Sequence, residues 1–191
     1  LIHGPHGWGE FAPFLEYGAQ ESAAWLACAL EAAWLPTPKP VRTRIPLNAT
    51  LPAVPAERVP EVLAKYEGEI QELKIKVAEK GQSLADDIAR VAAARDALPN
   101  ARLKVDANMG YTLAGALDAL RKLCEYGIIY AEQPVASIED MAALRFAIAK
   151  EGLPARIAAD ESIRKAEDPL KVARANAADL MVIKAAPLGG V

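Results

Sequence analysis

Five ionisable side chains recur along the chain at intervals of 24 to 30 residues, each in the C-terminal part of a short apolar run. They are Lys76, Asp106, Glu132, Asp160 and Lys184. Three carboxylates brought together form an all-oxygen ligand set, which Mg²⁺ prefers in proteins. A lysine close to a divalent cation and a second lysine is pushed toward its neutral form and can serve as a base. These residue types indicate removal of a proton α to a metal-bound carboxylate.

Each of these positions also has an ordinary structural explanation when it is taken alone. Lys74 and Lys76 alternate with apolar residues, as they do in a strand whose polar face is solvated. Asp106 followed by Asn108 is more often a turn than a pair of ligands, and Glu132 can simply end a strand. The repetition of such residues in register along five runs is harder to explain this way. It favours one shared site.

The segments that must position these residues alternate between strand-like and helical patterns of apolar residues. Short runs with strand character are separated by longer segments with helical spacing of apolar residues, which predicts an α/β fold with a parallel sheet. The carboxyl ends of all parallel strands lie at one edge of the sheet, or at one mouth if the sheet closes into a barrel. Periodicity leaves both arrangements open. In chain order, the strand-like and helical segments are residues 45–50, 56–66, 73–77, 83–98, 102–107, 112–126, 128–134, 137–150, 156–161, 168–177 and 179–184.

The helical segments carry recognisable start signals and apolar stripes. Ser83 with Asp86 has the S-x-x-D spacing of a helix N-terminus, and the segment from residue 137 repeats it. Leu84, Ile88, Val91 and Leu98 recur at helical spacing and form the stripe expected to lie on the sheet.

The N-terminal part of the chain follows a different pattern. Residues 22–35 form the most apolar stretch, too short to span a bilayer, and we expect a buried helix there. The segment "PTPKP", residues 36–40, marks a domain boundary. His3 and His6 have no common zinc-site spacing and are expected in loops. The chain starts without methionine and stops at "LGGV", so we expect it to be part of a longer protein.

Composition limits the classes of partner. The net charge is −3 with acids and bases interspersed, which argues against nucleic acid and against an anionic membrane. A small-molecule carboxylate substrate is the expected partner. Cys28 and Cys124 lie far apart in helical segments and are expected to be reduced core thiols, which favours a cytoplasmic location.

Several motifs resemble those of a known family. "KIKV", "VDAN", "AEQP", "ADES" and "VIKAAPLGG" look like the strand motifs of the enolase superfamily, muconate-lactonizing subgroup, in the same order and at similar spacing. The resemblance implies a partial TIM-like (β/α)7β barrel with about six strands present, preceded by part of an α+β capping domain. Residues 1–38 would be the C-terminal part of the capping domain, and residues 39–191 an incomplete barrel domain.

The resemblance also implies residue roles. A lysine base with Mg²⁺ at an ene-diolate is the general chemistry of this family, and it is the resemblance that assigns this chemistry to the chain. Asp106, Glu132 and Asp160 would ligate Mg²⁺, with Mn²⁺ as the other candidate. Lys76 would take the α-proton and return it to the departing hydroxyl. Lys184 would stay protonated and stabilise the enediolate as a cation over a π-system.

Within the subgroup, the segments "GWGEFAPFLEY" and "GQSLADDIARV" are similar to actinobacterial o-succinylbenzoate synthases. That likeness implies a lyase that dehydrates 2-succinyl-6-hydroxy-2,4-cyclohexadiene-1-carboxylate to 2-succinylbenzoate, a step of menaquinone biosynthesis. Lys74 would support the first lysine electrostatically, while Asn108 and Glu161 would orient the ligands.

Three other functions stay open at the level of sequence. N-acylamino acid racemases and dipeptide epimerases of the same subgroup would use Lys76 and Lys184 as two bases on opposite faces. A truncated, non-catalytic remnant would keep the motifs without the activity. A nucleotide-binding open sheet is disfavoured, because the sequence has no Gly-rich turn between a first strand and its helix.

Overall fold

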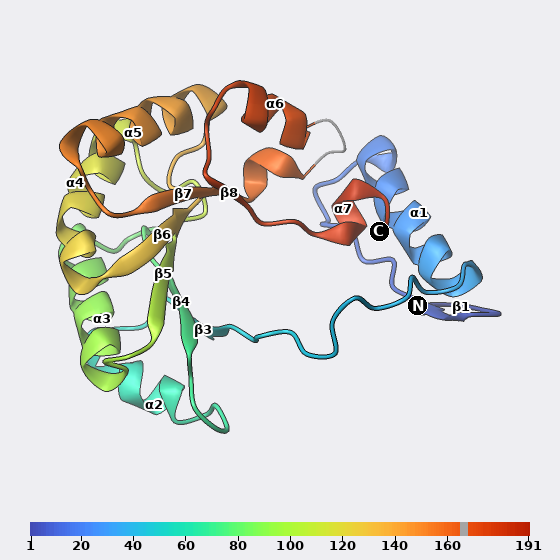
Figure 1. The fold of residues 1–191 in the computed structure, drawn as a ribbon, viewed down its shortest axis with the longest axis horizontal. Helices are drawn as coiled ribbons and strands as arrows, with labels where there is room; N and C mark the ends of the chain where they lie inside the picture. Colours follow the sequence, from blue (N-terminus) through green and yellow to red (C-terminus); the bar gives the residue numbers. More distant parts are fainter. Residues whose placement is uncertain (165–167) are drawn as a thin grey trace. The chain divides into compact units, whose positions relative to one another are not determined.

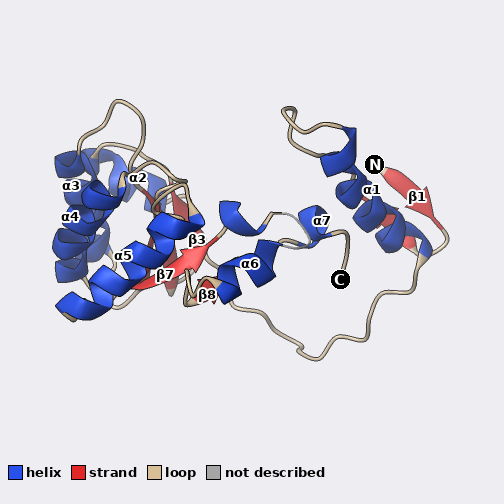
Figure 2. Cartoon of the chain, turned by 90° about the horizontal axis from the view of Figure 1, so that it is seen from above, coloured by secondary structure: helices blue, strands red, loops and turns tan. Residues whose placement is uncertain are grey.

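The computed structural model describes residues 1–164 and 168–191 and has an α/β architecture (Figures 1 and 2). Its contacts divide the chain into two compact units. The larger unit comprises Pro46–Ser162 and Val172–Met181, and the smaller comprises Leu1–Ile45, Ile163–Lys171 and Val182–Val191.

The larger unit is built on a six-stranded parallel sheet whose strands follow chain order. This confirms the predicted α/β fold with one parallel sheet. Within the described residues the first and last strands form its two edges. The strands are β3 (Ala49–Leu51), β4 (Glu72–Lys76), β5 (Arg102–Asp106), β6 (Ile128–Glu132), β7 (Arg156–Ala159) and β8 (Leu180–Met181), and every neighbouring pair is parallel.

Helices follow the strands as the sequence predicts, and Figure 1 shows α3, α4 and α5 along one side of the sheet. The connecting elements are η1 (Ala56–Arg58), α2 (Val59–Leu63), α3 (Leu84–Ala97), α4 (Leu113–Leu123), η2 (Cys124–Tyr126), α5 (Ile138–Glu151), η3 (Glu161–Ile163) and α6 (Asp168–Arg174). Parallel strands need such crossovers, and the helices bury one face of the sheet. The carboxyl ends of all six strands therefore point in one direction.

The start of α3 forms as the sequence predicts. Ser83 and Asp86 make a complete capping box, in which the Asp86 carboxylate accepts the Ser83 N–H at 2.7 Å. At the start of α5, the Ser137 hydroxyl accepts the Asp140 N–H at 3.0 Å. These bonds satisfy backbone donors that the first helical turn leaves without partners.

The buried stripe of α3 differs from the predicted one. Of the four apolar residues expected there, only Val91 is fully buried. Asp87 and Arg90 take the central positions and are 1% and 0% exposed. The prediction was wrong because it counted apolar residues only, whereas this helix buries an ion pair.

The smaller unit contains an antiparallel hairpin of β1 (Ile2–Gly4) and β2 (Gly7–Gly9), together with helix α1 (Ala19–Trp34) and helix α7 (Ala185–Leu188). The hairpin lies close against α1. A Cβ on Gly9 would stand 1.8 Å from the Ala29 carbonyl oxygen, so only glycine permits this approach.

Two predictions for the smaller unit differ from the structure. Helix α1 forms, but only Ala29 and Ala33 on it are buried, while Leu30 is 42% exposed. The narrow glycine-containing hairpin covers only one side of the helix. The other side stays exposed, so the expectation of a buried helix was wrong. His3 lies in strand β1 and not in a loop, although His6 does lie in the turn.

The two cysteines, Cys28 and Cys124, are free thiols, as predicted, but both are only half-buried. They are therefore not the core residues that the sequence led us to expect. Among the described residues, no helix is long and apolar enough to cross a bilayer.

We expect Ser83→Ala to lower the free energy of unfolding by about 1 kcal/mol, because it removes the hydroxyl half of the α3 capping box. Urea unfolding followed by circular dichroism measures the change. Ser22→Ala is the control, since Ser22 lies inside α1 and caps no helix there, and we expect no loss of stability. Equal stability of Ser83→Ala and the wild type would contradict the role of the cap.

Candidate active site

The register of the sheet brings the predicted residues together at the carboxyl ends of three strands. Lys76 on β4 is the cross-strand partner of Asp106 on β5, and Asp106 is the partner of Glu132 on β6. Neighbouring residues in register on parallel strands point to the same face of a sheet. Asp160 directly follows the last residue of β7, at the same end of the sheet. The strand spacing in the sequence therefore becomes a cluster in space.

Strand β4 separates its two kinds of side chain by face. Leu73 and Ile75 are completely buried on one face, whereas the side chains of Lys74 and Lys76 are 22% and 31% exposed on the other. The two lysines reach the carboxylates of neighbouring strands. The polar face of this strand is therefore part of the cluster and is more than a solvated surface.

Ion pairs connect the two lysines to the carboxylates. Lys74 Nζ lies 3.0 Å from Asp106 Oδ2 and 3.1 Å from Glu132 Oε1. Lys76 Nζ lies 2.6 Å from the same Asp106 oxygen. Asp106 and Glu132 are 0% and 1% exposed, so these charges have little contact with water and depend on each other.

The pKa shifts follow from this arrangement. Burial opposes the charge of Asp106, but the bonds from Lys76 and Lys74 lower the pKa of its carboxyl overall. Burial and the nearby charge of Asp106 raise the pKa of Glu132. Burial disfavours the Lys74 ammonium, yet its bond to Asp106 and the charge of Glu132 raise the pKa of Lys74 overall. Lys74 therefore stays a cation between two carboxylates.

The charged neighbour of Lys76 bears on its expected role as a base. The sequence led us to expect that like charges push this lysine toward its neutral form. In the structure its closest charged partner is the Asp106 carboxylate, with Nζ 2.6 Å from Oδ2. The role of Lys76 as a base therefore stays a prediction.

Asn108 links Lys76 to Glu161. Its side-chain oxygen accepts from Lys76 Nζ at 2.5 Å, and its amide nitrogen donates to Glu161 Oε1 at 2.9 Å. Asn108 has a φ of 43°, a left-handed conformation that asparagine tolerates better than most residues, and its N–H donates to Asp106 Oδ1 at 3.2 Å. The structure thus brings the two predicted supporting residues Asn108 and Glu161 into contact, while their roles stay predictions.

Gln133 also belongs to the site, although its residue type and spacing did not point to it. Its side chain is 0% exposed, and Oε1 accepts the backbone N–H groups of Asp160 at 3.0 Å and Ser162 at 3.1 Å. Its amide nitrogen donates to Ser162 Oγ at 2.7 Å and to Val135 O at 3.0 Å. Gln133 thereby fastens the chain at Asp160 to the end of β6. The only sequence signal was a polar residue between Glu132 and a proline.

The three carboxylates suit a hard divalent cation by their chemistry. Asp106, Glu132 and Asp160 are 0%, 1% and 3% exposed and supply only oxygen ligands. The negative charges of Asp106 and Asp160 both disfavour ionisation of Glu132, and a cation would offset this repulsion. Their positions do not yet form a metal site, since within the described ranges no three acidic, histidine or cysteine side chains lie close enough together to hold a metal ion. Lys74 is instead the cation between Asp106 and Glu132.

Lys184 is the one predicted catalytic residue in the smaller unit. It immediately precedes the first turn of α7. All the other predicted site residues belong to the larger unit. The role of Lys184 therefore stays a prediction.

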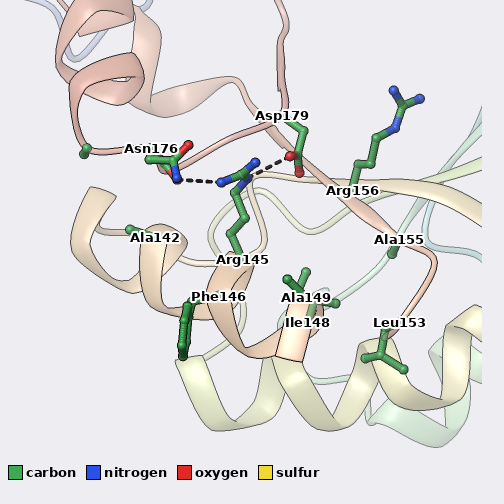
Figure 3. A pocket seen from close by; sticks show the side chains of 11 residues that line it. Ala142, Arg145, Phe146, Ile148, Ala149, Leu153, Ala155, Arg156, Asn176 and Asp179 are labelled. Atoms are coloured by element: carbon green, nitrogen blue, oxygen red, sulfur yellow. Dashed lines mark hydrogen bonds and ion pairs between the residues drawn. The ribbon is translucent and has the colours of Figure 1, made fainter. Parts of the chain in front are cut away.

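A surface pocket of about 340 Å³ lies away from this cluster (Figure 3). Arg145 on its wall reaches Asp179 at 2.7 Å and the Asn176 backbone carbonyl at 3.4 Å. Arg156, the first residue of β7, also lines the pocket, which therefore lies toward the amino ends of the strands. It contains none of the predicted site residues.

The chain matches two family descriptions. Residues 56–191 match the enolase C-terminal domain-like family, and residues 1–33 match the enolase N-terminal domain-like family. Similar proteins include the o-succinylbenzoate synthase of Mycolicibacterium smegmatis, 58% identical over all of this chain and 57% of that protein. The o-succinylbenzoate synthase of Mycobacterium leprae is 52% identical over all of this chain and 55% of that protein. The chain thus spans somewhat more than half the length of these curated relatives.

Solved structures share the fold. A mandelate racemase/muconate lactonizing family protein from Azoarcus is 33% identical, with a TM-score of 0.67 over 78% of this chain and 39% of that one. An L-talarate dehydratase from Polaromonas, crystallised with Mg and L-glucarate, is 26% identical, with a TM-score of 0.64 over 75% of this chain and 40% of that one.

We expect Glu132→Gln to raise the melting temperature of chelator-treated protein at pH 7. The pKa of Glu132 is raised, so its ionisation destabilises the fold above the ordinary glutamate pKa of about 4.3, and fully so above the higher folded-state value. Below about pH 4 both proteins carry a neutral group at this position and the difference disappears.

The control for this prediction is Glu151→Gln. The hydrogen bond from Arg121 lowers the pKa of this surface carboxylate, so its removal does not raise stability at pH 7. Thermal melts in EDTA across pH measure both variants. A lower melting temperature of Glu132→Gln than of wild type at pH 7 would contradict the predicted sign.

Proposed function

The chain belongs to the enolase superfamily, and we propose on that basis that it acts as an o-succinylbenzoate synthase. The observation that carries the proposal is the cluster itself, with Lys76 held at Asp106 and Asp106 in register with Glu132. The names of relatives that are 52% to 58% identical over the whole chain support this choice of reaction.

The proposed reaction is the loss of water from 2-succinyl-6-hydroxy-2,4-cyclohexadiene-1-carboxylate. Lys76 Nζ takes the proton α to the substrate carboxylate, and the electron pair moves toward the carboxylate. The C–O bond to the ring hydroxyl then breaks, and Lys76 gives its proton to the departing oxygen, which leaves as water. Loss of the hydroxyl makes the ring aromatic, so the product is 2-succinylbenzoate and atoms and charge balance.

The other residues hold the charges in place. Lys74, an ammonium between Asp106 and Glu132, reduces the repulsion of these carboxylates. Asn108 accepts from Lys76 Nζ and thereby orients it. Mg²⁺, or Mn²⁺ in its place, would be held by Asp106, Glu132 and Asp160 and would supply positive charge where the substrate carboxylate becomes more negative. Lys184 completes the proposal as a cation on the other side of the ring.

Under this proposal the partner is a small-molecule carboxylate, and neither nucleic acid nor a membrane takes part. The reaction belongs to menaquinone biosynthesis in the cytoplasm. A racemase or epimerase acting on N-acylated amino acids would use the same cluster. Succinylated amino acids therefore belong in the substrate panel.

We expect Lys76→Ala to lower kcat by about 10²–10⁴-fold, since the variant loses the general acid and base. The decrease in cyclohexadiene absorbance measures turnover after metal is removed by chelator and Mg²⁺ is restored. Lys122→Ala, at an exposed lysine of α4 paired with Asp118, is the control and keeps wild-type rates. Metal-independent turnover, or full activity of Lys76→Ala, would contradict the proposal, and turnover of succinylated amino acids alone would favour the racemase.

A further inference from the structure

Helix α3 buries an ion pair directly behind the strand that carries Lys76. Asp87 and Arg90 are 1% and 0% exposed, and Arg90 Nη1 lies 2.9 Å from Asp87 Oδ1. Buried ion pairs often add little stability over apolar side chains, because both charges must be removed from water. The pair therefore calls for an explanation other than stability.

Arg90 supplies hydrogen-bond donors to β4 beyond the point where its backbone pairing with β3 ends. The ladder between β3 and β4 ends at the pair Leu51 and Ile75, and the next residue of the β3 chain is Pro52, which has no N–H. Beyond this point Arg90 Nη1 donates to the carbonyl oxygen of Lys76 at 2.9 Å. On the side of β3 the end of β4 is thus held by a side chain, while on the side of β5 the Val77 N–H donates to the Asp106 carbonyl at 3.0 Å.

The same guanidinium also holds the segment after β3. Arg90 Nε donates to the Val54 carbonyl at 2.6 Å, and Nη2 donates to Gln82 Oε1. Gln82 in turn donates to the Ala53 carbonyl at 2.8 Å. Five donors in a rigid planar fork let one arginine reach several acceptors in fixed directions.

Asp87 fastens two further segments. Its Oδ2 accepts the Ala78 N–H at 2.9 Å and the Tyr111 hydroxyl at 2.7 Å. Ala78 has a φ of 58°, an unfavourable conformation for alanine that the surrounding contacts must maintain. The pair therefore joins the segments that follow β3, β4 and β5.

We propose that the buried Asp87–Arg90 pair is a positioning device for Lys76. It fixes the carboxyl end of β4 to the segments that follow β3 and β5, so that Lys76 Nζ stays at Asp106 and Asn108 on the opposite face of the sheet. Neither member of the pair contacts the reacting atoms. The inference rests on the proposed function, because the positioned residue is the proposed base.

The first test is Arg90→Lys, which keeps the charge beside Asp87 but cannot bond Val54, Lys76 and Gln82 in the directions of the guanidinium. We expect kcat to fall at least about tenfold with KM within about twofold, since a shift of about 1 Å at a catalytic group can cost about 10²-fold. The primary isotope effect on kcat, with substrate deuterated at the α carbon, rises because proton removal becomes slower.

A second variant guards against misfolding of the first. Asp87→Asn with Arg90→Met removes both charges, keeps an acceptor for Ala78 or Tyr111, and again leaves the Lys76 carbonyl without Arg90. The control is Val91→Ala, at a fully buried neighbour on the same helix, which makes a cavity and leaves the hydrogen bonds of Asp87 and Arg90 in place. We expect Val91→Ala to lower the melting temperature without changing the isotope effect.

The outcomes separate this inference from the proposed function. If the Arg90 variants match Val91→Ala in kcat and isotope effect, the pair is structural only and the proposal is overturned. No turnover by the wild type overturns the proposed function. Hydrogen exchange at the Val77 and Ala78 amides then still tests whether the pair fixes the end of β4. Faster exchange in both Arg90 variants supports this role, and unchanged exchange contradicts it.

Discussion

The structure depends on balancing buried negative charge at the carboxyl ends of parallel strands. Asp106, Glu132 and Asp160 are nearly inaccessible to water, and isolated buried carboxylates would be strongly unfavourable. Lys74 and Lys76 on the neighbouring strand offset part of this charge. Burial and the charge of Asp106 nevertheless raise the pKa of Glu132.

The sheet converts a sequence spacing into this cluster. In-register parallel pairing places Lys76, Asp106 and Glu132 side by side, and the two-residue period of β4 sends its lysines to the face opposite its buried aliphatic residues. Side-chain hydrogen bonds then fasten the ends of two strands further. Gln133 fastens Asp160 to the end of β6, and Arg90 fastens Lys76 at the end of β4.

The sequence predicted the strands and the candidate ligands because these features are local. Alternation in β4, the capping box at Ser83 and the recurring charged residues need only neighbours in the chain. The missed features depend on long-range contacts. Gln133 meets partners up to 29 residues away, and Arg90 replaces donors that β3 cannot supply. Likewise, the exposed face of α1 could not be predicted, because apolar composition does not tell how much of a helix its neighbours cover.

Binding of Mn²⁺, followed by the loss of the free-ion signal in electron paramagnetic resonance, tests the central claim most directly. The account predicts one site in the wild type, lost in Asp160→Asn as well as in Asp106→Asn, although Asp106 ends β5 and Asp160 follows β7. The exposed Asp118→Asn on α4 keeps the site. No binding by the wild type, or equal binding by either site variant, would contradict the claim that these strand ends form one metal-binding active site.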